Sequence, residues 1–104
     1  SIQKCLSYIH THYQEDITLN DIATYGDISA GYCGRLFQKI LKTSPYEYLI
    51  DFRIQKSLEL MTTPHYTITQ IATSVGFNSV SHFIQCFKKK LKMTPKQYQK
   101  QISR

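Results

Sequence analysis

Hydrophobic residues recur along this chain with the 3.6-residue period of helices, and the pattern predicts seven helices and almost no strand. The first helix is expected over residues 1–13, where apolar side chains share one helical face: Ile2, Cys5, Leu6, Ile9 and Tyr13. The fold class that follows from this pattern is all-α.

Capping residues indicate where several later helices begin. Thr18 and Thr67 each precede a short apolar segment, and Gln70 completes a capping box with Thr67. Residues 44–47 and 94–97 also have the pattern of capping boxes, with Pro at the first helical position, where its missing N–H is harmless. Both halves of the chain therefore use the same cap chemistry.

One long helix is expected between the two halves. It begins at Ser44 and continues to about Met61, because no Gly or Pro interrupts the sequence before Pro64. At 1.5 Å per residue, about 17 residues form a rod of roughly 25 Å. The predicted organisation is one domain over residues 1–104 with three parts: a first subdomain at 1–43, a connecting helix at 44–62 and a second subdomain at 63–104.

An internal repeat with a period of about 50 residues relates the two halves. The matched segments are Ile22-Ala23 and Ile71-Ala72, Leu36-Phe37-Gln38-Lys39 and Cys86-Phe87-Lys88-Lys89, and Ser44-Pro45 and Thr94-Pro95. Each copy has a short helix with an Ala on its inner face, a tight turn and a longer helix. This pattern is typical of a helix-turn-helix, whose second helix enters a DNA major groove.

The turn inside each copy sets a backbone requirement. Gly76 stands where the short helix of the second copy reverses, a position that usually requires a positive φ, and Phe77 fills the angle between the helices. The aligned residue of the first copy is Asp27, which tolerates the left-handed region less readily than Gly. The first turn is therefore predicted to be distorted or less stable.

Basic residues concentrate in the second half of the chain. Residues 1–52 contain four basic and six acidic residues, whereas residues 53–104 contain nine basic residues and one acidic residue. The basic residues near the end are Lys88, Lys89, Lys90, Lys92, Lys96, Lys100 and Arg104. Such a patch indicates a polyanionic partner. The alternative is a solvated, lysine-rich surface helix.

Composition excludes several classes of protein. With 104 residues, 41% of them hydrophobic, the chain can bury a core and is not expected to be disordered. Its three cysteines are far apart, which argues against a disulfide framework and a structural zinc site and favours a reducing compartment such as the cytoplasm. No apolar run approaches the roughly 20 residues that span a bilayer, so no membrane partner is expected.

Three motifs follow one another at a characteristic spacing in the second copy. They are Ile71-Ala72-x-x-Val75-Gly76-Phe77, Phe83-x-x-x-Phe87-Lys88-Lys89 and Thr94-Pro95-x-x-Tyr98. Together they resemble the signature of the AraC/XylS family of bacterial transcription regulators. A weaker copy lies upstream, so the resemblance covers essentially the whole chain.

The resemblance implies a homeodomain-like domain in which a long central helix bridges two helix-turn-helix units that bind double-stranded promoter DNA. It also implies contact with RNA polymerase, activation of transcription and a location in the bacterial cytoplasm, on the nucleoid. No cofactor is implied. Most members carry a separate effector or dimerisation domain. Because this chain opens without Met inside a helical pattern, we expect an excised C-terminal domain.

Helical phase separates the core and DNA-facing sides of the first recognition helix. The predicted core stripe is Cys33, Leu36, Phe37 and Ile40. The predicted base readers are Ala30, Gly31, Gly34 and Arg35, and the predicted phosphate contacts are Ser29, Gln38 and Lys39. Arg35 is the best base reader, because its planar fork can donate two hydrogen bonds to guanine. The resemblance also places a DNA-contacting residue there; a surface or phosphate-bound Arg is the alternative.

Two glycines in this helix depart from the family's larger side chains. Each of Gly31 and Gly34 should cost the helix about 0.8 to 1 kcal/mol relative to Ala. Either they allow the DNA backbone to approach closely, or this unit reads few bases. The second explanation is favoured.

The second recognition helix offers more polar side chains. Its predicted core stripe is Phe83, Cys86, Phe87 and Leu91. The predicted base readers are Asn78, Ser79, Ser81 and Gln85, and the predicted phosphate contacts are His82, Lys88 and Lys89. His82 aligns with Tyr32, and both are expected to be half-buried packing residues whose polar tips reach phosphate.

No catalytic or metal-binding arrangement is evident in the sequence. His10 and His12 lie about 200° apart on a helix, so they are not expected to share a metal. No Ser-His-Asp arrangement or carboxylate pair is indicated, and an enzyme is not expected. Two functions are compared: a sequence-specific regulator of transcription, or a non-specific basic nucleic-acid-binding accessory module. A protein-interaction module is a distant third alternative.

Overall fold

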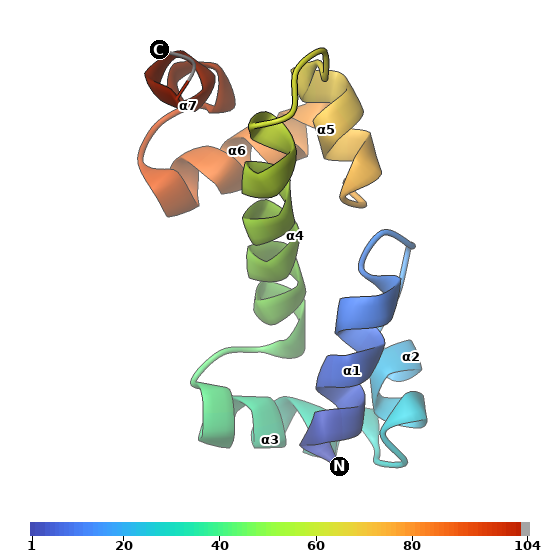
Figure 1. The fold of residues 1–104 in the computed structure, drawn as a ribbon. Helices are drawn as coiled ribbons and strands as arrows, with labels where there is room; N and C mark the ends of the chain where they lie inside the picture. Colours follow the sequence, from blue (N-terminus) through green and yellow to red (C-terminus); the bar gives the residue numbers. More distant parts are fainter. Residues whose placement is uncertain (103–104) are drawn as a thin grey trace. The chain divides into compact units, whose positions relative to one another are not determined.

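The structure is a computed structural model, and it describes residues 1–102. These residues form seven α-helices and no strand, which confirms the predicted fold class (Figure 1). The helices are α1 (Ile2–His12), α2 (Leu19–Tyr25), α3 (Ala30–Leu41), α4 (Pro45–Met61), α5 (Ile68–Ser74), α6 (Val80–Leu91) and α7 (Pro95–Ile102). Arg104, the last basic residue of the sequence, lies outside the described residues.

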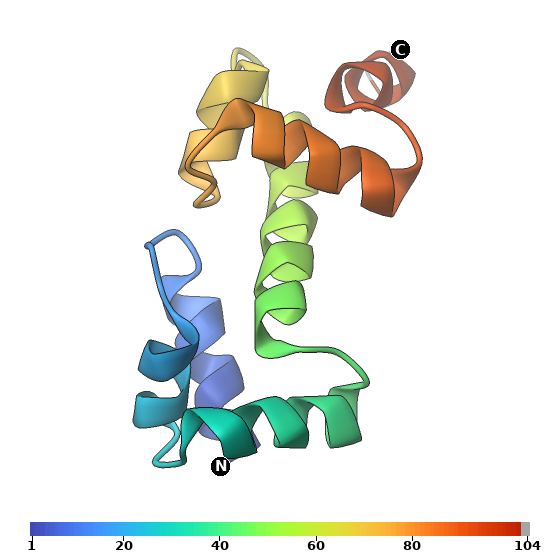
Figure 2. The same ribbon diagram turned by 180° about the vertical axis from the view of Figure 1, so that it is seen from behind.

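The chain divides into two compact units, and the division falls inside α4. The first unit ends at Phe52 and the second begins at Arg53. Each unit contains a short helix followed by a tight turn and a twelve-residue helix, α2 and α3 in one and α5 and α6 in the other (Figure 2). The internal repeat of the sequence is therefore a repeat of structure.

The first unit packs around a core contributed by α1, α2, α3 and the start of α4. Its buried residues are Cys5, Ile9, Ile22, Ala23, Cys33, Phe37 and Leu49. A capping box begins α2, in which the Thr18 hydroxyl accepts from the Asp21 N–H at 3.1 Å and the Thr18 N–H donates to the Asp21 carboxylate at 2.9 Å. A cap of this kind is worth about 1 kcal/mol. It fixes the helix that packs behind α3.

The second unit has an aromatic core. Its largest fully buried side chains include Phe83 and Phe87 on α6, whose rings lie 5.7 Å apart. The Tyr98 ring of α7 packs against the Phe87 ring of α6 at a centroid distance of 5.8 Å. Tyr98, the last residue of the Thr94-Pro95-x-x-Tyr98 motif, therefore holds α7 against α6. Capping boxes at Thr67–Gln70 and Thr94–Gln97 begin α5 and α7, as predicted.

The turns of the two units share a positive φ at the aligned residue and an equivalent backbone hydrogen bond. Gly76 has a φ of 103°, as predicted, and Asp27 occupies the left-handed region with a φ of 60°. The Ile28 N–H donates to the Ala23 carbonyl at 3.1 Å, and the Phe77 N–H donates to the Ala72 carbonyl at 3.0 Å. The prediction that the Asp27 turn is distorted is therefore wrong, whereas a lower stability of this turn stays a prediction. Asp is among the residues that adopt the left-handed region most readily after Gly.

Candidate nucleic-acid interface

One face of α3 is buried and the opposite face is exposed. Cys33 and Phe37 are completely buried, and Leu36 is half-buried. Ile40 is 51% exposed, so its assignment to the core stripe is wrong: in the last turn of α3 the neighbouring Leu41 packs against the core instead. The exposed face is thus wider than the sequence pattern indicated.

Most residues predicted to contact DNA from α3 lie on this exposed face. Those with exposed positions are Ser29, Gly31, Arg35, Gln38 and Lys39. Gly34 is half-buried, and Ala30 is half-buried against the core, which leaves only part of its methyl group accessible. The exposed face of the first half of α3 therefore combines small residues with the longer Arg35 side chain.

Arg35 has an aromatic neighbour that helical phase did not single out. Its guanidinium carbon lies 6.0 Å from the centroid of the Tyr32 ring. The Tyr32 side chain is 47% exposed, so the expectation that Tyr32 is a half-buried packing residue is wrong. The i, i+3 spacing could have indicated this pair, because residues at that spacing are neighbours on a helix.

The exposed face of α6 carries the polar residues predicted for the second unit. Asn78, Ser79, Ser81 and Gln85 are all exposed, on the side opposite the buried Phe83 and Phe87. The predicted phosphate contacts Lys88 and Lys89 are also exposed. The α6 surface therefore combines hydrogen-bonding side chains at its N-terminal end with lysines at its C-terminal end.

His82 combines a packing contact with partial exposure, as predicted. Its side chain is half-buried, and its ring lies edge-on to the ring of Phe77 at 5.3 Å. Phe77 in turn lies 5.9 Å from the guanidinium carbon of the buried Arg53 on α4. This series of contacts connects α4 with the turn that begins α6.

Serine hydroxyls cap both recognition helices. The Ser29 Oγ accepts from the Tyr32 N–H at 3.1 Å, and the Ser79 Oγ accepts from the His82 N–H at 3.1 Å. A hydroxyl that accepts one hydrogen bond can still donate its own proton. The two serines can therefore cap their helices and donate to a phosphate or a base acceptor at the same time.

Lysines gather at the C-terminal ends of both recognition helices. Lys39 is in the last turn of α3, and Lys88, Lys89 and Lys90 are in the last turns of α6. Cations at this end interact favourably with the helix dipole, so part of their role is structural. The C-cap residues are also lysines: Lys42 and Lys92 both have a positive φ and donate their N–H to the helix.

Several other ionisable side chains contact neighbours within the first unit. The Nε2 of His10 lies 2.7 Å from the Tyr48 hydroxyl, and the Nδ1 of His12 lies 2.8 Å from a Glu15 carboxylate oxygen, so the two histidines have different partners. Burial and the neighbouring Cys5 thiol raise the pKa of Cys33 to about 12. Within residues 1–102, no three metal-ligating side chains cluster, and no helix is long and apolar enough to cross a membrane.

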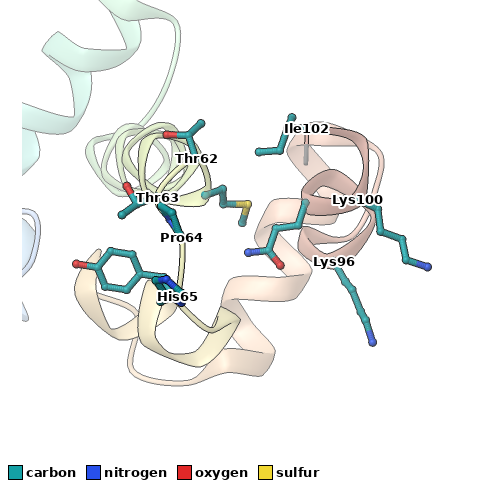
Figure 3. Close-up of a pocket in the computed structure, with 10 residues that line it drawn as sticks. Thr62, Thr63, Pro64, His65, Lys96, Lys100 and Ile102 are labelled. Carbon is teal, nitrogen blue, oxygen red and sulfur yellow. The ribbon is translucent and has the colours of Figure 1, made fainter. Parts of the chain in front are cut away.

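A cavity of about 540 Å³ lies in the second unit, between the segment that follows α4 and the helix α7 (Figure 3). Its lining residues are Met61, Thr62, Thr63, Pro64, His65, Tyr66, Lys96, Gln99, Lys100 and Ile102. In Figure 3 the Lys96 and Lys100 side chains extend outward from α7. Among the described residues, the lining has no carboxylate.

The duplicated units define the class of this protein. Each has a capped short helix, a left-handed turn residue and a capped long helix with one buried and one exposed face. This is the helix-turn-helix arrangement of DNA-binding proteins. Residues 22–101 match the family described as the helix-turn-helix domain. The chain belongs to this family, and within it to the AraC/XylS transcription regulators, as the sequence motifs indicated.

Known proteins share both the sequence and the fold. The chain is 44% identical over 102 residues to the HTH-type transcriptional regulator YdeC of Bacillus subtilis, covering 98% of this chain and 35% of that protein. An AraC-type DNA-binding regulator from Chromobacterium violaceum has a TM-score of 0.90 at 26% identity, covering 98% of this chain and 91% of that one. The C-terminal domain of the response regulator yesN from Fusobacterium nucleatum has a TM-score of 0.87 at 32% identity, covering 94% and 96%.

These comparisons confirm the expectation that the chain is not an enzyme, because the family and its relatives are transcription regulators. They also support DNA binding and transcription regulation as its function. The chain spans about a third of the length of the curated relatives it matches.

Proposed function

We propose that this chain recognises a specific double-stranded promoter sequence by inserting α3 and α6 into successive major grooves, and that the protein thereby regulates transcription. The observation that carries the proposal is the shared design of the two helices. Each buries an apolar stripe and exposes a face with side chains that can reach base edges, Arg35 on α3 and Gln85 on α6. Family membership supports the DNA-binding role.

The exposed residues divide into two roles in this proposal. Side chains on the exposed faces of α3 and α6 read bases: Arg35 donates two hydrogen bonds to guanine, and Gln85 pairs with adenine. Ser81 can serve several bases. Phosphates are contacted by Lys39, Lys88 and their neighbours, which fix the register of the protein on the duplex but carry no sequence information.

The continuous helix α4 supports reading by both units at once. It has 17 residues, and at 1.5 Å per residue this gives a rod of about 25 Å that belongs to both units. Successive major grooves on one side of B-DNA are about 34 Å apart. A continuous helix is a stiffer connection than a flexible Gly/Ser linker. Any remaining mismatch requires the DNA to bend at a cost of a few kcal/mol.

The distribution of basic residues favours the second unit as the one that makes most of the phosphate contacts. Residues 53–104 carry nine of the thirteen Lys and Arg residues, and the three lysines at the end of α6 lie beside its predicted reading face. Each phosphate contact releases counterions, so this unit gains most from them. Footprinting at rising salt tests this order: protection over the half-site of the first unit should be lost first.

The chain acts, in this proposal, as the DNA-binding part of a larger bacterial regulator. Its curated relatives are about three times as long, which leaves room in such proteins for an effector or dimerisation domain. Activation through contact with RNA polymerase, in the cytoplasm where the promoter is found, completes the proposed role.

Selection of binding sites from randomised DNA, followed by mutagenesis, tests the proposal. A specific regulator should bind the selected site about 10³-fold or more tightly than unrelated DNA at physiological salt. Arg35→Ala should reduce discrimination at one position of the site, at a cost of about 1 to 3 kcal/mol. Lys88→Ala should weaken binding to all sequences alike and lower the salt dependence by about one phosphate contact.

The competing function is a non-specific basic accessory module. It predicts that selection yields no consensus sequence and that Arg35→Ala and Lys88→Ala weaken all sequences equally. Either result would contradict sequence-specific recognition.

A further inference from the structure

Tyr32 and Arg35 form a pair on the exposed face of α3. The Arg35 guanidinium carbon lies 6.0 Å from the Tyr32 ring centroid, within the range of a cation–π contact. Both side chains are exposed, Tyr32 to 47%. The guanidinium therefore rests beside an aromatic ring on the surface that faces away from the core.

Gly31 shows in which direction the Arg35 side chain extends. A Cβ added to Gly31 would lie 3.5 Å from Nη1 of Arg35, so the guanidinium lies over the helix one turn before its own Cα. Side chains in helices lean toward the N-terminus. The N-terminal residues of a recognition helix are the ones that contact base edges. Arg35 thus reaches the end of α3 where base reading takes place.

We propose that Tyr32 is a positioning residue that orients Arg35 for base reading. The Tyr32 ring flanks the guanidinium, and the bare surface at Gly31 gives it room to lie at the N-terminal end of α3. A guanidinium that is already oriented loses less conformational freedom when it donates to guanine. Tyr32 therefore sharpens sequence preference through Arg35. This inference depends on the base-reading role of Arg35 proposed above.

The pair also offers an explanation for Gly31. A long side chain at this position would occupy the space over the helix that the guanidinium uses. An Ala would still fit beside the guanidinium, because 3.5 Å is an ordinary van der Waals contact, so the available space limits the length of the side chain at position 31 and does not itself require Gly. Gly34, by contrast, has no heavy atom within 4 Å of an added Cβ, so this explanation does not apply to it.

A double-mutant cycle tests the proposal. Affinities of Tyr32→Leu, Tyr32→Phe, Arg35→Ala and the Tyr32→Leu/Arg35→Ala double variant are measured on the selected site and on the same site with the guanine replaced. Tyr32→Leu should reduce the ratio of the two affinities about two- to fivefold, the range for an exposed cation–π contact. Tyr32→Phe, which keeps the ring, should retain the ratio. In the Arg35→Ala background, Tyr32→Leu should cause no further change.

Tyr66→Leu is the matched control, because Tyr66 is another exposed tyrosine, on the segment before α5. It should show no coupling with Arg35→Ala. Thermal unfolding of each variant checks that the fold is retained, and Tyr32→Gln provides a second variant without an aromatic ring.

Two failures can be distinguished. If Arg35→Ala reduces discrimination but Tyr32→Leu and Tyr32→Gln do not, the positioning role is wrong and base reading by Arg35 stands. The same conclusion follows if Tyr32→Leu has an equal effect with and without Arg35, or if Tyr32→Phe loses as much as Tyr32→Leu. If Arg35→Ala leaves discrimination unchanged, base reading by Arg35 is wrong and the positioning role falls with it.

Discussion

Replacing Gly34 with Ala distinguishes the effect of this residue on the stability of α3 from its effect on DNA binding. Gly34 lies in the interior of α3, and a Cβ added there meets no heavy atom within 4 Å. Because Gly is about 0.8 to 1 kcal/mol less favourable than Ala in a helix interior, Gly34→Ala should raise the free energy of unfolding by about that amount. In a domain of about 100 residues, this corresponds to an increase in Tm of roughly 4 to 8 °C.

Urea and thermal unfolding followed by far-UV circular dichroism measure the change, and hydrogen exchange of the α3 amides assigns it to the first unit. Gly26→Ala provides the matched control. The same methyl group added at Gly26 would collide with the Sγ of Cys5 in the core, so this variant should lose about 1 to 3 kcal/mol. The two substitutions are chemically identical and should shift stability in opposite directions.

An unchanged or lowered stability of Gly34→Ala would refute the reasoning, because it would mean that the added methyl group meets an obstacle. Affinity for the selected DNA site decides between the two explanations of the glycine. If this unit reads few bases, the stabilised variant binds as tightly as the original chain. If the DNA approaches the bare helix closely, the stabilised variant binds the site more weakly.

Three further predictions concern caps, backbone and pH. Thr67→Ala and Thr18→Ala each remove a capping box and should lower the free energy of unfolding by about 1 kcal/mol in urea titrations. Gly76→Ala forces an L side chain into a φ of 103° and should cost about 1 to 3 kcal/mol by the same measurement. Stability should fall as the pH rises from about 9 toward 12, because the unfolded chain releases the Cys33 proton at its ordinary pKa of 9.0, whereas the folded chain retains it up to about 12. Cys33→Ala should reduce this alkaline loss, and an unchanged loss would contradict the assignment.

The sequence predicted the helices and their order because the signals are local. Thr18, Thr67 and Thr94 cap helices through hydrogen bonds to residues three positions later, so a short segment contains the whole interaction. The 3.6-residue period likewise identified Cys33 and Phe37, and Phe83 and Phe87, as the buried sides of α3 and α6. The repeat then indicated that both helices belong to the same kind of unit.

The tertiary structure decided what depends on the meeting of separate segments. Ile40 has the spacing of a core residue but is exposed, whereas its neighbour Leu41 packs against the core, so spacing alone does not fix which residue of that turn is buried. Position 26 requires Gly because a side chain there would collide with the Sγ of Cys5, which comes from a different helix. The pairing of Tyr32 with Arg35 depends on side-chain conformation, which periodicity does not specify. Periodicity and caps therefore determined which faces of the helices are apolar, and packing between helices decided how deep each residue lies and which side chains meet.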